Sequence, residues 1–162
     1  MARVDLTTHI AAPPERCFDL ARSVELHTQS TAATGEVAIA GRTHGLLGPG
    51  DEVTWRARHF GVWQQLTSRI TAYDRPRHFR DAMVKGAFAR LDHDHHFADD
   101  GGGGTIMRDV LDFAAPLGPL GRLAERVVLI RYLRGFLEAR NRAIKAAAES
   151  DVWKRFLSPT AP

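Results

Sequence analysis

Three segments in the middle of the chain alternate apolar and polar residues so that histidine and aspartate fall on the apolar side. They are residues 79–83, 91–97 and 107–113. A β-strand sends every second side chain to one face, so His93 and His95 share a face with Leu91. By the same parity, Asp81 and Asp109 lie with the apolar residues of their own segments. Four titratable groups on an apolar face indicate that this face lines a cavity.

The alternation extends along the chain as a series of short predicted strands. A first strand at 4–11 precedes a helix that opens at Pro13 and Pro14, because proline suits the first helical turn. A second short helix is predicted at 24–29. Six strands then follow as an antiparallel meander, in which Phe60-Gly61 forms a short hairpin turn. These strands are predicted at 35–41, 51–60, 62–73, 79–85, 88–98 and 105–114.

From about 118 to 150 the spacing of apolar residues becomes helical. An amphipathic helix of this length needs a broad surface to cover, and the meander supplies one. We expect a curved antiparallel sheet of about seven strands, closed by this helix, with a deep pocket between them. Residues 1–150 then form one ligand-binding domain and 151–162 a tail. The residues expected to be buried against the concave face of the sheet are Leu123, Val127, Ile130 and Leu137.

The composition and charge of the chain favour a globular protein and argue against several other classes. The chain has 162 residues, 44% hydrophobic and 25% charged, which is typical of one globular domain. The net charge is +3 and the arginines are scattered, so no basic stripe indicates nucleic-acid binding. The single cysteine, Cys17, excludes an intramolecular disulfide and fits a reducing compartment. The first residues do not resemble a signal peptide, and the longest apolar run, 127–130, is too short to span a bilayer. We therefore expect a cytoplasmic protein.

The order of elements resembles the helix-grip fold of the START-like superfamily, also called SRPBCC. The stretches that carry the resemblance are 8–18, 79–97, 104–109 and 113–118. The chain is most similar to the polyketide cyclase/dehydrase-like or coenzyme-Q-binding-like branch, over nearly its whole length. The resemblance implies an α+β fold and a small, largely apolar ligand such as a lipid, fatty acid, polyketide or quinone. Because the superfamily includes carriers, receptors and cyclases, it leaves open whether the chain is an enzyme.

Hairpin geometry brings the polar residues into one row. A turn at 86–88 places Asp81 opposite His93. In the glycine-rich turn at 99–104, a centre at Gly101 places Asp109 opposite His93, and a centre one residue later places it opposite His95. The full set of residues predicted to line the ligand site is Trp55, His59, Gln64, Leu66, Ile70, Asp81, Met83, Leu91, His93, His95, Phe97, Met107, Asp109 and Leu111.

Four interpretations of the polar row are open from sequence alone. The row is a hydrogen-bonded network that supports a binding cavity, or it performs acid–base catalysis, for which His93, His95, Asp81 and Asp109 are the candidates. Alternatively, two histidines and a carboxylate hold a metal, or a β-bulge turns the histidines to solvent. We predict no structural metal and no cofactor.

Two further expectations concern His93 and the partners of the chain. We expect the His93 side chain to face the cavity, with Asp81 or Asp109 within hydrogen-bonding reach and a pKa above 6.5. The expected partner is a small hydrophobic ligand, with no nucleic acid and no stable membrane insertion. The oligomeric state, including a dimer, is left open.

Overall fold

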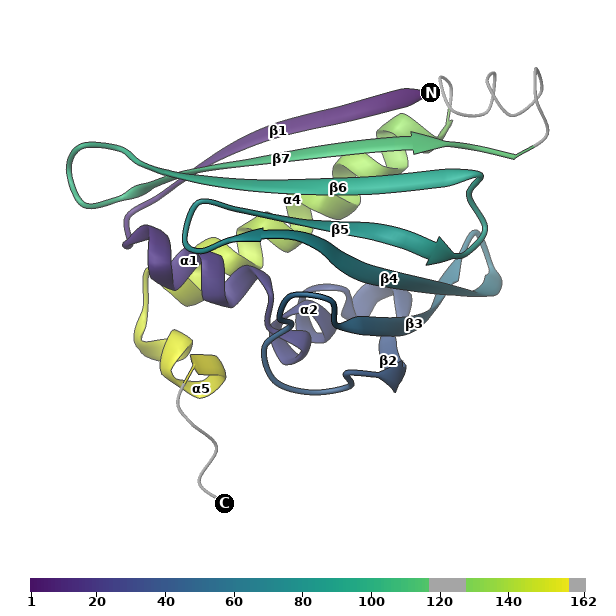
Figure 1. Cartoon of the computed structure of the whole chain (residues 1–162), viewed down its shortest axis with the longest axis horizontal. Coiled ribbons are helices and arrows are strands. Elements are labelled where there is room, and N and C mark those ends of the chain that lie inside the picture. Colours follow the sequence, from purple (N-terminus) through teal and green to yellow (C-terminus); the bar gives the residue numbers. More distant parts are fainter. Residues whose placement is uncertain (117–127, 158–162) are drawn as a thin grey trace.

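The computed structural model describes residues 1–116 and 128–157. It contains one seven-stranded antiparallel sheet in the order β1-β7-β6-β5-β4-β3-β2, as Figure 1 shows. This is the predicted meander, with the first strand paired back onto the last. The strands are β1 (Ala2–Ile10), β2 (Val37–Gly41), β3 (Glu52–His59), β4 (Val62–Asp74), β5 (His78–Lys85), β6 (Arg90–Asp99) and β7 (Thr105–Ala114).

The predicted helix pair follows β1, and one long helix follows the sheet. In Figure 1 the long helix, α4, crosses behind the sheet. The seven-strand curved sheet with this helix is the predicted helix-grip architecture. The helical elements are α1 (Pro14–Ala21), α2 (Val24–Ser30), η1 (Ala32–Thr34), α4 (Ile130–Ala148), η3 (Asp151–Trp153) and α5 (Lys154–Leu157).

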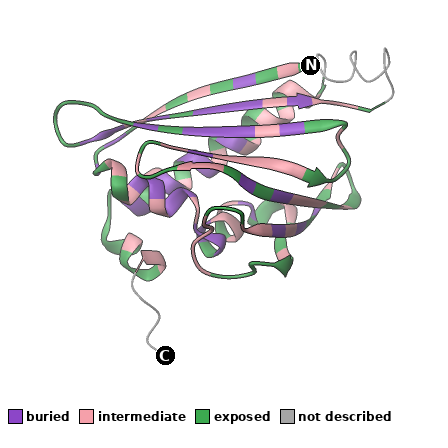
Figure 2. Ribbon diagram, in the orientation of Figure 1, coloured by how far each residue is buried: buried purple, intermediate pink, exposed green. Residues whose placement is uncertain are grey.

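The apolar face of α4 packs against the concave side of the sheet. Leu137 is buried, as predicted, in a cluster with Leu91, Leu111 and Phe113, and Ile130 packs at the border of that cluster. The predictions for Leu123 and Val127 fall outside the described residues. The core between sheet and helices follows from the alternation of each strand, which Figure 2 shows as buried positions along β6 and β7.

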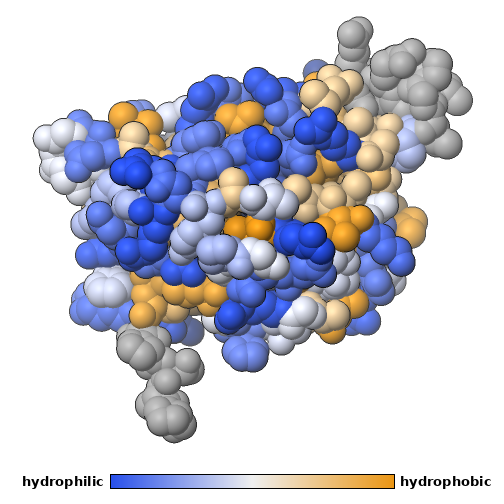
Figure 3. Space-filling model, in the orientation of Figure 1, coloured by the Kyte–Doolittle hydropathy of each residue, from blue (hydrophilic) through white to orange (hydrophobic). Residues whose placement is uncertain are grey.

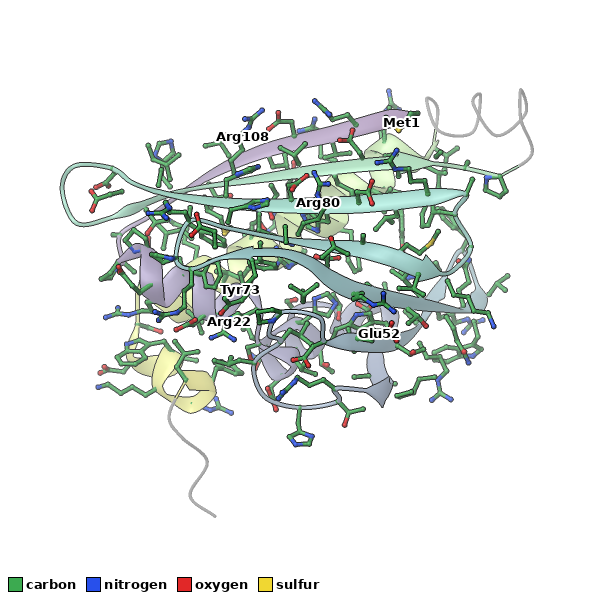
Figure 4. All side chains as sticks on the ribbon, viewed as in Figure 1. Met1, Arg22, Glu52, Tyr73, Arg80 and Arg108 are labelled. Atoms are coloured by element: carbon green, nitrogen blue, oxygen red, sulfur yellow. The ribbon has the colours of Figure 1, made fainter. Side chains whose placement is uncertain are left out.

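The residues that alternate with the inward-facing ones lie on the convex face of the sheet, and several of them are charged. Arg80 and Arg108 lie on the side of the sheet turned away from α4 (Figure 4). Arg80 donates to Asp94 at 2.9 and 2.7 Å, and Arg108 donates to Asp5 at 3.0 and 2.6 Å. These pairs are exposed at one or both ends, so each contributes less than about 1 kcal/mol to stability.

Two local features matter for the site. The β3–β4 hairpin turns at Phe60 and Gly61, whose φ angles of 52° and 78° give the left-handed conformation of a two-residue turn. Glycine adopts this conformation freely, whereas phenylalanine rarely does. At the other end of the molecule, Trp153, Phe156 and Leu157 pack on the main core, so this part of the tail is docked. None of the described helices is long and apolar enough to cross a membrane.

Candidate functional site

The strand pairing brings the predicted polar row together. Asp81 lies opposite His93, as predicted, and Asp109 lies opposite His95. The β6–β7 turn is therefore centred one residue later than Gly101, which selects the second of the two predicted registers. His93 and His95 are 7% and 1% exposed, so the interpretation that turned them to solvent is wrong.

His95 lies at the centre of the row, between the two aspartates. Its Nδ1 is 2.7 Å from an oxygen of Asp109, and its Nε2 is 2.9 Å from an oxygen of Asp81. An ionised carboxylate only accepts hydrogen bonds, so both ring nitrogens of His95 donate. Donation from both nitrogens is the pattern of an imidazolium. Phe79 stacks on this ring at 4.2 Å between centroids and closes one side of it.

Asp109 is the most heavily bonded member of the cluster. One of its oxygens accepts from His93, His95 and Arg140, at 3.1, 2.7 and 3.3 Å. The other accepts from Asn141 at 2.8 Å. Burial raises the pKa of this carboxyl, but the hydrogen bonds from the two histidines and the charges of His95 and Arg140 hold it well below its usual range. Asp109 is therefore an ionised and completely buried anchor.

Asp81 completes the row and is more accessible. Burial raises its pKa, but the hydrogen bond from His95 and the charges of His95 and Arg140 lower it to about 2. The cluster thus holds two carboxylates, Asp81 and Asp109, against two cations, His95 and Arg140. This balance offsets the large cost of taking charges out of water.

The two α4 residues in the cluster were not predicted from sequence. Arg140 also donates to the carbonyl of Ala21 at 3.0 Å, and Asn141 also contacts the hydroxyl of Thr8 at 3.2 Å. Both side chains are buried. The polar cluster therefore fastens α4 to the concave face of the sheet and to the end of α1.

His93 corrects one prediction and confirms another. Its Nε2 is 3.1 Å from Asp109, and its Nδ1 is 4.0 Å from Asp81, so a carboxylate lies within hydrogen-bonding reach as expected. Its pKa, however, is lowered rather than raised. Burial is the largest cause, the charge of neighbouring His95 adds to it, and the hydrogen bond to Asp109 only partly opposes them. His93 is therefore a neutral imidazole that donates from Nε2 and presents an unprotonated Nδ1.

Three hollows follow one another along the sheet, and residues of α4 line the inner and the outer one. The inner hollow, about 80 Å³, is lined by Asp81, His93, His95 and Arg140, together with Trp55. The middle hollow, about 50 Å³, shares Trp55 with the inner one. The outer hollow, about 210 Å³, opens beside the first turn of α4. The residues that line both the outer and the middle hollow are His59, Gln64, Ala87 and Phe88.

The structure divides the predicted lining into two sets. Those predicted residues that border a hollow between sheet and helices are Trp55, His59, Gln64, Leu66, Ile70, Asp81, His93 and His95. The rest are packed in or against the hydrophobic core, or, for Asp109, sealed within the polar cluster. They are Met83, Leu91, Phe97, Met107, Asp109 and Leu111.

His59 and the first turn of α4 form the rim of the outer hollow. The Nδ1 of His59 is 2.5 Å from the hydroxyl of Tyr132, and the ring of Phe60 lies 4.6 Å from that of Tyr132. These contacts tie the β3–β4 hairpin to α4. Tyr132, Leu133 and Phe88 were not predicted as lining residues.

Comparison with known proteins places the chain in a family. A family model described as polyketide cyclase / dehydrase and lipid transport matches residues 1–149. The chain belongs to this family. A search of curated proteins finds no match.

Solved structures similar to this family member share its fold at low sequence identity. The protein TTHA0849 from Thermus thermophilus is 20% identical, with a TM-score of 0.70, covering 91% of this chain and 99% of its own. A START superfamily protein from Mycobacterium smegmatis is 14% identical, with a TM-score of 0.67 and coverage of 91% and 97%. Ginseng major latex-like protein 151 from Panax ginseng is 18% identical, with a TM-score of 0.62 and coverage of 92% and 98%. These similarities establish the fold.

A metal-ligand set exists in this family member, but its hydrogen bonding favours a network. Asp81, His93 and His95 present donor atoms within 4.8 Å of one another, a combination that can bind a divalent metal. Both nitrogens of His95 already point at carboxylates, and Arg140 places a fixed positive charge beside Asp109, the carboxylate that His93 and His95 share. A cation would have to displace a proton and approach the guanidinium, so the arrangement fits a proton-bound network better.

The lowered pKa of His93 leads to a pH prediction. Below pH 6.5 the unfolded chain binds a proton at this position that the folded chain does not, so stability falls as pH drops below 6.5. We expect the His93 ring signals in a heteronuclear NMR titration to change with a midpoint below 6.5, with the proton on Nε2 above it. The variant His93→Gln assigns the signals and should flatten this part of the stability curve. A midpoint above 6.5 would show that Asp109 and Asp81, not burial, control this ring.

Proposed function

We propose that the protein binds a small, largely apolar ligand that carries a hydroxyl group, such as a lipid alcohol, a phenolic polyketide or a quinol. The apolar body of the ligand would occupy the outer and middle hollows, and its hydroxyl would reach the inner one. The observation that carries this proposal is the series of hollows that ends on a buried charged cluster. The family description, polyketide cyclase / dehydrase and lipid transport, supports the ligand class.

The preference for a hydroxyl comes from the groups at the inner end. Asp81 offers carboxylate oxygens, and His93 offers an unprotonated Nδ1, so both groups accept hydrogen bonds. The donors of the cluster, His95 and Arg140, already bond to carboxylates and to a backbone carbonyl. A ligand hydroxyl donates to such a site, whereas a ligand carboxylate would face Asp81 as a like charge.

The volumes of the hollows indicate how a ligand would occupy them. Sites for drug-sized ligands usually measure about 300–1,000 Å³, and each hollow is smaller than that. One ligand would therefore extend through all three, and Trp55 and Phe88, which stand between them, would change rotamer. Aromatic and apolar walls with a few converging polar groups are the usual form of a small-molecule site.

Competition between matched ligands tests this proposal. The neutral fluorophore N-phenyl-1-naphthylamine should gain emission on binding, and unlabelled competitors should displace it. We expect 1-dodecanol to displace it at about tenfold lower concentration than dodecanoate, a difference of about 1.4 kcal/mol. In His93→Gln this preference should shrink. No saturable fluorophore binding, or a preference for dodecanoate, would contradict the proposal.

A second function shares the same site. A neutral His93, oriented by Asp109 and bordering the inner hollow, has the properties of a general base toward an enolisable ligand. The neutral ring is the observation that favours acid–base chemistry of the cyclase or dehydratase type. The NMR titration of His93 tests its premise, because a ring protonated at neutral pH could not accept a proton.

A further inference from the structure

The end of the molecule that holds the outer hollow exposes large apolar side chains. The apolar tip consists of Phe60 in the turn of the β3–β4 hairpin and of Val62 and Trp63 at the start of β4, which are 58%, 61% and 58% exposed. Val37 on the neighbouring edge strand is exposed as well. Part of this apolar surface is visible at the right-hand end of the molecule in Figure 3, where Figure 1 places the β3–β4 hairpin.

Phe60 shows how unusual this exposure is. Its backbone is in the left-handed conformation, which is unfavourable for phenylalanine. Asparagine or glycine would adopt this conformation at such a turn more easily. The ring gains little burial in return, since it stays 58% exposed while it contacts Tyr132 at the rim of the outer hollow. An exposed aromatic residue beside the opening of a cavity is a feature of surfaces that contact a partner.

Exposed cations lie on the elements around the apolar tip. Arg56 and Arg58 lie on β3, where Arg56 sits over the Trp63 ring at 5.4 Å and Arg58 donates to the carbonyl of Gly61 at 3.0 Å. The cationic collar consists of these two residues together with Lys85 at the end of β5 and Arg131 and Arg134 in the first turns of α4.

The charges of this end and those of the convex face differ in their pairing with acidic side chains. Within residues 1–116 and 128–157, no carboxylate lies within ion-pair distance of a collar residue. On the convex face, by contrast, Arg80 and Arg108 each bind an aspartate. Of the acidic groups near the collar, Glu36 is buried against His27 and Asp92 binds Arg90. Glu138 is exposed one turn after Arg134 on α4 and forms no ion pair with a described residue.

We propose that the apolar tip and the cationic collar dock the protein on an anionic lipid bilayer, with the outer hollow facing the lipid. Exposed Trp and Phe side chains enter the interfacial region of a bilayer, and arginines beside them meet lipid phosphates. The inference rests on the proposed function, because docking in this orientation lets an apolar ligand pass between bilayer and hollow without crossing water. A bilayer is favoured over a protein partner because the collar is of one sign and accompanies a small apolar projection.

Vesicle sedimentation of the whole protein tests the docking. We expect binding to vesicles of phosphatidylcholine with phosphatidylglycerol, weak binding to phosphatidylcholine alone, and release by high salt. Val62→Ser/Trp63→Ser removes apolar side chains that border none of the three hollows, and Arg131→Gln/Arg134→Gln removes two collar charges. Each double variant should lower the vesicle partition coefficient by about tenfold or more. Arg142→Gln, an exposed cation further along α4, is the matched control and should bind like the wild type.

The other outcomes are distinguishable. Absence of binding to anionic vesicles, or an equal loss in Arg142→Gln, overturns the docking surface. So does a dimer in analytical ultracentrifugation that Val62→Ser/Trp63→Ser dissociates, because the tip would then be an interface between copies. Fluorophore binding without vesicles should be unchanged in both double variants, since none of the four residues borders a hollow. Vesicle binding that behaves as predicted while the fluorophore does not bind would support the docking and refute the proposed function alone.

Discussion

Replacing Asp109 with asparagine should lower the free energy of unfolding by about 3–5 kcal/mol, because it leaves two buried cations without their shared counter-charge. His95 and Arg140 both point at the same oxygen of this side chain, and neither can turn to solvent. Asparagine has nearly the same shape as aspartate, so packing is retained. The loss of unfolding free energy therefore measures the contribution of the negative charge. An insoluble or unfolded variant is the extreme form of the same result.

The matched control lies on the same strand. Asp112 faces the convex side and pairs with Arg3, whose side chain is 60% exposed. Asp112→Asn should therefore change stability by less than about 1 kcal/mol. Urea unfolding at pH 7, followed by circular dichroism, gives both values. Equal losses in the two variants would mean that the inner cluster carries no more energy than a surface ion pair.

The sequence was sufficient to predict which face each strand turns inward. Parity alone placed His93 and His95 on the buried side and Arg80 on the outer one, because a strand has a strict two-residue period. It did not fix the β6–β7 register, since a run of four glycines imposes no single turn centre. The pairing of Asp109 with His95 rather than His93 depends on that one-residue choice.

The burial of Arg140 could have been predicted from the sequence, but its partner could not. It lies three residues after Leu137 and four before Ile144, which puts it on the apolar stripe of α4. A charged residue on such a stripe indicates a buried partner. Nothing in one sequence, however, states that the partner is Asp109, because strand and helix are brought together only by the fold.

The error in the pKa of His93 has a physical cause. The prediction weighed the nearby carboxylates and neglected two opposing effects, burial and the positive charge on His95. The alternation of residues also does not show which part of the concave face is covered by a helix. Phe97 and Met107 face the concave side as predicted, but α1 fills the space there, and Phe18 packs edge-on against Phe97 at 5.4 Å. The inner hollow begins beside Ala21, the last residue of α1.

Closing the passage between the outer and middle hollows should abolish most ligand binding. Ala87 borders both hollows from the exposed β5–β6 turn, so a larger side chain can be placed there without disturbing the core. We expect Ala87→Trp to raise the dissociation constant for N-phenyl-1-naphthylamine by about tenfold or more. Its unfolding free energy should stay within about 0.5 kcal/mol of the wild type, because the position is exposed.

The measurement that tests the central claim most directly is a fluorophore titration of Ala87→Trp beside Ala89→Trp. Ala89 is exposed, lies two residues further along the same turn and borders none of the three hollows, so it carries the same added indole without the obstruction. Binding lost in Ala87→Trp and kept in Ala89→Trp is the result expected for a ligand held between sheet and α4. Equal binding in both variants and the wild type would place the ligand elsewhere.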